Sequence, residues 1–110
     1  MEAAQIRIYH AAWLDDAEVQ LKLTKSRVLL TDTTFKRGNW KDALQMAVGL
    51  RPATALVVAA RLADERLWIG VLERGAYDLI QKPFQADELR RILENAHNHA
   101  TTGKPMHMTA

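Results

Sequence analysis

Two charged side chains, fifty positions apart, each follow a short apolar run. Asp32 ends the run Val28-Leu29-Leu30-Thr31-Asp32, and Lys82 precedes Pro83 and Phe84 after a second run at residues 77–80. Such runs are typical of buried strands, and open parallel α/β sheets place ligand groups in the crevice beyond the carboxyl ends of their strands. The sequence therefore predicts that the two charges can meet. Taken alone, Asp32 could be a nucleophile or a turn residue that bonds its own loop, and Lys82 could be a surface turn residue.

The elements that would position this pair alternate along the chain. Strands are predicted at residues 6–9, 27–32, 55–60 and 77–80, and helices at residues 13–23, 40–50, 64–74 and 86–97, with a loop at residues 33–37. Alternation with short connections predicts an α/β fold, an open parallel sheet of about four strands with helices on both faces. Residues 1–98 are expected to form the domain, and residues 99–110 a flexible tail.

Composition narrows the class of protein. The chain has 110 residues, enough for one core, and its 15 Lys+Arg against 13 Asp+Glu give a formal charge of only +2. No nucleic-acid or membrane partner is required by that balance, and the arginines are interleaved with acidic residues as on a solvated face. Cysteine is absent, no apolar stretch is long enough to span a bilayer, and the N-terminus has no signal pattern. We expect a cytoplasmic protein.

The segment from residue 27 to residue 97 resembles the receiver domain of response regulators, the flavodoxin-like family of two-component signalling. The most specific part is Gly75-Ala76-Tyr77-Asp78-Leu79-Ile80-Gln81-Lys82-Pro83-Phe84, which matches the family's lysine signature. The resemblance implies that Asp32 stands at the phosphoacceptor position and that Lys82 pairs with the phosphoryl group. It also implies Mg²⁺ as cofactor, a histidine kinase as partner, and a hydroxyl that senses the phosphoryl group.

The metal-binding part of this family pattern is not found in the sequence. A receiver begins with a strand that ends in an acidic pair, whereas this chain is expected to start at the family's second strand, without the first βα unit. Asp15 and Asp16 are a minor alternative for that pair, because they fall in the first turn of a predicted helix, where they favour the helix dipole. Mg²⁺ binding is therefore doubtful, with Asp32 as the one weak candidate ligand.

The switch residues of the family are also replaced. Ala59 or Ala60 stands where the family has a serine or threonine, and neither can donate a hydrogen bond. Ile80, two positions before the lysine, stands where the resemblance places an aromatic partner. Lys36 replaces the usual proline after the acceptor, and Arg37 beside it makes that rim basic.

Two functions remain open at this point. The chain is either a phosphorelay receiver that accepts a phosphoryl group at Asp32, or a degenerate pseudo-receiver that acts as a phosphorylation-independent interaction or dimerisation module. Neither is an enzyme. In the flavodoxin-like strand order 2-1-3-4-5 the first strand is central, so its loss would leave a gap. Either residues 6–9 pair directly with residues 27–32, or a second copy covers the exposed surface, and a homo-oligomer is expected.

Overall fold

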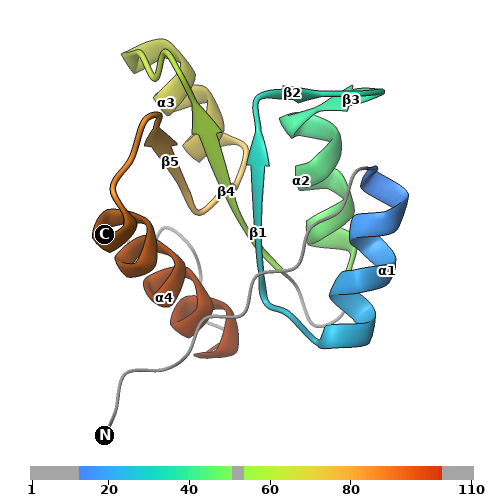
Figure 1. Cartoon of the computed structure of the whole chain (residues 1–110). Helices are drawn as coiled ribbons and strands as arrows, with labels where there is room; N and C mark the ends of the chain where they lie inside the picture. The colour runs from blue at the N-terminus through green and yellow to red at the C-terminus, as the bar shows by residue number, and fades with distance from the viewer. Residues whose placement is uncertain (1–12, 51–53, 103–110) are drawn as a thin grey trace, which may run out of the picture.

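The centre of the fold is β4 (Ala55–Ala60), a strand whose six residues are all apolar and all buried. The structure is a computed structural model and describes residues 13–50 and 54–102 (Figure 1). β4 lies between β1 (Val28–Asp32) and β5 (Asp78–Gln81), and both neighbours run parallel to it. A continuously apolar central strand is what a sheet covered on both faces requires. The predicted α/β parallel-sheet fold is therefore confirmed.

Helices cover both faces of this sheet. Residues of α2 (Trp40–Gly49) and α3 (Glu65–Glu73) share one hydrophobic cluster with alternate residues of β4, and α4 (Ala86–Thr102) shares a second cluster with the remaining ones. α1 (Leu14–Thr24) contacts α2 and adds Leu14 to the first cluster. Because strand side chains alternate between faces, β4 supplies Leu56, Val58 and Ala60 to one side and Ala55, Val57 and Ala59 to the other.

The segment after Asp32 differs from the predicted loop. It contains a two-stranded antiparallel hairpin, β2 (Thr34–Phe35) and β3 (Gly38–Asn39), at the carboxyl edge of the main sheet. Gly38 leaves room there for two side chains, because an added Cβ would come within 2.8 Å of Phe35 Cε1 and 2.9 Å of Asp42 Oδ2, and both would have to shift. Asn39 then caps α2, since its side chain accepts from the Lys41 and Asp42 N–H groups. The hairpin and the cap fix the direction in which α2 leaves the carboxyl edge of the sheet.

Two further predictions differ in extent or lie outside the description. The last helix continues to Thr102 rather than ending near residue 97, because Ala96 and Ala100 extend its apolar stripe onto the second cluster. Residues 99–102 of the predicted tail are therefore helical, and the division into a domain at 1–98 and a tail stays a prediction. The predicted strand at residues 6–9 lies outside the described residues. Within the described ranges no helix is both long and apolar enough to cross a membrane.

Candidate functional site

Asp32 and Lys82 meet at the carboxyl edge of the sheet. The Lys82 Nζ ammonium donates to Asp32 Oδ1, forming an ion pair between residues fifty positions apart in the chain. Asp32 is the last residue of β1, and Lys82 directly follows the last residue of β5. The structure thus confirms the prediction that these two charges can meet.

The backbone of the sheet sets this encounter. Asp32 is in register with Ala59 of β4, which is in register with Ile80 of β5, so the three strands end at one level. The Lys82 N–H donates to the Ala60 carbonyl oxygen at 2.8 Å, and a cis peptide bond joins Lys82 to Pro83. A lysine held in this way can direct its side chain across the end of β4 toward Asp32.

Solvent reaches both partners of the pair. The side chains of Lys82 and Asp32 are 35% and 55% exposed, respectively. A carboxylate oxygen that is open to solvent, with an ammonium group against it, can attack an electrophile brought from outside, and the ammonium can pair with the anion that forms. The arrangement is therefore suited to an incoming phosphoryl group.

Comparison with known proteins finds similar sequences and a similar fold. The chain is 26% identical over 72 residues to the chemotaxis protein CheY of Listeria monocytogenes and, equally, of Listeria innocua, and that match covers 66% of this chain and 60% of each CheY. No family model matches. The fold matches the signal receiver domain of a Vibrio parahaemolyticus protein described as a Luxo repressor, with a TM-score of 0.74 at 20% identity, over 86% of this chain and 73% of that one.

The chain is thus similar in sequence to CheY proteins, and it has the fold of a signal receiver domain. It spans about three fifths of the length of the CheY proteins that it matches, at 60% of each. Similarity at this level shows the fold and leaves the role of the chain and the chemistry of Asp32 to be argued from the site.

Buried apolar side chains fill the three positions that the resemblance compares with the family's switch residues. Ala59, Ala60 and Ile80 are 3%, 4% and 2% exposed, and none of them offers a side-chain donor. Ala59 and Ile80 are in register and lie in the cluster under α4, whereas Ala60 lies on the opposite face together with Leu79. Ile80 can therefore pack beside Ala59 on the same face of the sheet, but not beside Ala60. The sequence alone did not say which of the two alanines lies next to Ile80.

The described residues form no cluster of metal-binding side chains. They hold no group of three His, Asp or Glu side chains that could bind one ion. Asp15 and Asp16 lie in the first turn of α1, where the Gln20 side-chain amide donates to Asp16 at 3.4 Å, and they are not joined to Asp32 by any metal-binding cluster. Mg²⁺ is commonly held through one or two carboxylates together with water and phosphate oxygens, so Asp32 stays the one weak candidate ligand that the sequence offered.

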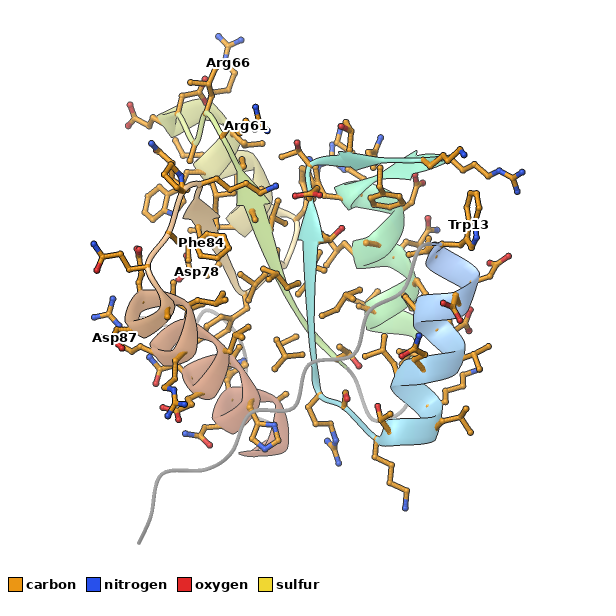
Figure 2. All side chains as sticks on the ribbon, viewed as in Figure 1. Trp13, Arg61, Arg66, Asp78, Phe84 and Asp87 are labelled. Atoms are coloured by element: carbon orange, nitrogen blue, oxygen red, sulfur yellow. The ribbon has the colours of Figure 1, made fainter. Side chains whose placement is uncertain are left out.

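The basic rim of the site has a partner that sequence reasoning missed. Lys36 and Arg37, at the tip of the β2–β3 hairpin, lie over the indole ring of Trp13, with Lys36 Nζ 5.3 Å and Arg37 Cζ 4.8 Å from the ring centroid. Figure 2 shows Trp13 at the end of α1 nearest this hairpin. An aromatic residue just before an acidic first turn was the available signal, but nothing in the sequence links it to residues 36 and 37. These contacts fasten the hairpin to α1 by cation–π attraction.

Proposed function

We propose that this chain is a response-regulator receiver protein in phosphorelay signalling and that Asp32 is its phosphoacceptor. The observation that carries the proposal is the Asp32–Lys82 ion pair, built from the carboxyl ends of two strands that are separated by β4. The receiver fold and the similarity to CheY support it. The partner in this proposal is a histidine kinase.

The proposed transfer moves one phosphoryl group onto the carboxylate. An Asp32 oxygen forms a bond to phosphorus while the bond from phosphorus to the donor's imidazole nitrogen breaks, and the imidazole leaves with that electron pair. Lys82, released from the free carboxylate, pairs with the phosphoryl oxygens and offsets part of their charge. The chain acts in this step as an acceptor, and we assign it no turnover of a substrate.

A direct test is to incubate the full chain with acetyl phosphate, with and without Mg²⁺, and to measure the intact mass. The mass of one added phosphoryl group is expected for the wild type and not for Asp32→Asn. Asp87→Asn is the matched control, since Asp87 lies in the exposed first turn of α4 and has no part in the site. An unmodified wild type, or a gain in mass that persists in Asp32→Asn, would refute the assignment.

A second candidate is a phosphorylation-independent interaction module, and the apolar switch positions favour it. Because residues 59 and 60 are alanine, the end of β4 has no side-chain hydroxyl that could donate a hydrogen bond to a phosphoryl group on Asp32. Amide NMR spectra recorded with Mg²⁺ and an acyl-phosphate donor separate the two candidates. Shifts around Asp32 and Lys82 that vanish in Asp32→Asn favour the receiver, and a dispersed, unchanging spectrum favours the module.

We also propose that the protein is cytoplasmic and assembles as a homodimer. A dimer would cover apolar side chains that the described residues leave exposed, among them Leu23, Leu62 and Trp68. Sedimentation equilibrium at micromolar concentration tests this assembly, and a mass equal to one chain would contradict it.

A further inference from the structure

The outward face of α3 carries an apolar side chain between opposite charges. Val71 of this helix is fully buried in the first hydrophobic cluster, so the helix face opposite Val71 points away from the sheet. On that outward face Ile69 is 42% exposed. Figure 2 shows the Arg66 side chain pointing away from the body of the molecule. An open groove follows this face and is lined by Glu65, Arg66, Ile69, Gly70 and Glu73. The face is therefore a surface of mixed charge with an apolar centre.

Arg66 and Glu73 have no partner within the part of the chain that the structure describes. Neither side chain takes part in an ion pair or a hydrogen bond there. The two residues are seven positions apart, which is close to two helical turns, so both point to the same face. Their separation of about 10 Å along the helix axis is too long for a direct pair within one helix. The two charges are therefore available to groups outside α3.

Two copies of α3 are complementary to each other when they lie antiparallel. The midpoint between Arg66 and Glu73 falls between Ile69 and Gly70. A two-fold axis perpendicular to the helices at that midpoint sets Arg66 of each copy opposite the partner's Glu73, so one contact surface makes two ion pairs. A parallel arrangement would instead set like charges against each other, which weakens binding. The charge pattern therefore selects the antiparallel orientation.

The residues at the midpoint suit close contact between two helices. An added Cβ at Gly70 would meet no atom of the described residues within 4 Å, so the helix has an open notch there. A residue without a side chain allows a second backbone to approach closely. Ile69 beside the notch would meet the partner's Ile69 and lose its contact with water. The centre of such an interface is apolar and its two ends are ionic, as is common where two proteins meet.

We propose that this face of α3 is the homodimer interface, with α3 of a second copy packed antiparallel against it. The inference rests on the homodimer proposed above and does not depend on phosphorylation of Asp32. A second copy is the occupant because the same groove residues supply both sides of every contact, with each charge facing its opposite. A different partner protein would have to reproduce the reversed spacing of Arg66 and Glu73 by itself.

Charge reversal on α3 tests this pairing in the full chain by sedimentation equilibrium. Arg66→Glu replaces both ion pairs by pairs of like charge, and Glu73→Arg does the same with the opposite sign. Each variant should raise the dissociation constant of the dimer at least about a hundredfold, which is about tenfold for each of the two symmetric contacts. Arg90→Glu, at an exposed position of α4, is the matched control and should leave that constant unchanged.

The possible failures of this test are distinct. A wild type that sediments as one chain overturns both the pairing and the homodimer. A dimer that Arg66→Glu leaves unchanged overturns the pairing alone. If Arg90→Glu weakens the dimer as much as Arg66→Glu does, the effect is not specific to α3, and the pairing is again overturned.

An equal mixture of the two single variants gives a second readout. In a mixed dimer each reversed charge faces its opposite, so the mixture should restore the mass of two chains at a concentration where each variant alone sediments as one. The double variant Arg66→Glu/Glu73→Arg should likewise dimerise with itself. A mixture that stays monomeric, or a double variant that does, would overturn the pairing. Should a single variant unfold, the mass of the double variant decides, with two chains supporting the pairing and one chain overturning it.

Discussion

Replacement of Lys82 by methionine should cost little stability. Methionine keeps an unbranched apolar stem and removes the ammonium group that pairs with Asp32. Because the two side chains are 35% and 55% exposed, water screens the pair, and exposed ion pairs contribute about 0.2–1 kcal/mol. The loss in unfolding free energy should therefore stay below about 1 kcal/mol.

A double-mutant cycle isolates the energy of this contact. Urea unfolding of the wild type, Lys82→Met, Asp32→Asn and the double variant gives the coupling free energy, and the same cycle is repeated in 1 M salt. Coupling should fall in salt, because the Debye length shrinks to about 3 Å at 1 M. The control cycle uses Lys22 and Glu18 on α1, an exposed pair at 3.3 Å with side chains 63% and 41% exposed.

A coupling free energy above about 2 kcal/mol that does not fall in salt would refute this reasoning, because buried pairs behave in that way. It would mean that the pair holds β1 and β5 together and is not free to open for an incoming phosphoryl group. A coupling free energy close to that of the Lys22–Glu18 control would support an ion pair that is free to open for an incoming phosphoryl group.

Four further outcomes are expected. Ile80→Ala should lower the unfolding free energy by about 2–5 kcal/mol in urea titrations, because the side chain is 2% exposed in the core, and a loss below about 1 kcal/mol would contradict that packing. Asn39→Ala should cost about 1 kcal/mol through loss of the α2 cap, with Lys41→Ala as a control that keeps the cap. Gly75→Ala should cost about 1–2 kcal/mol from its φ of 105° alone, since an added Cβ meets nothing within 4 Å, and an unchanged melting temperature would argue against that backbone conformation. Burial, and secondarily the charge of Asp78, raise the pKa of Tyr77 above its usual 10.0, so the folded state holds this proton more tightly than the unfolded state does. The free energy of unfolding should therefore be at its full value below pH 10 and fall as the pH rises through the higher folded pKa. Thermal melts at pH 9 to 11 should show a smaller loss of stability in Tyr77→Phe than in the wild type.

The sequence predicted the parallel sheet and the Asp32–Lys82 pair because both rest on local patterns. Apolar runs mark β1, β4 and β5, and parallel strands bring their carboxyl ends to one edge whatever the loops do. The end of α4 was harder to predict, since its last turns are stabilised by Ala100 packing on a cluster formed mainly by distant residues. The contacts of Trp13 with Lys36 and Arg37 could not be predicted, because they depend on how the hairpin folds back onto α1.

Because Lys36 and Arg37 contact the ring of Trp13, the fluorescence of this tryptophan can report on changes near Asp32. Only residues 33–35 separate Asp32 from these two cations, which contact the ring of Trp13, a residue that is 39% exposed. Indole emission depends on nearby charge and on contact with water, and both change if the hairpin lifts. Trp40 is buried, but Trp68 is 47% exposed, so soluble quenchers would reach both Trp13 and Trp68, and a Trp68→Phe variant would isolate the emission of Trp13. Events at the carboxyl edge could thus be followed in real time without attaching a dye.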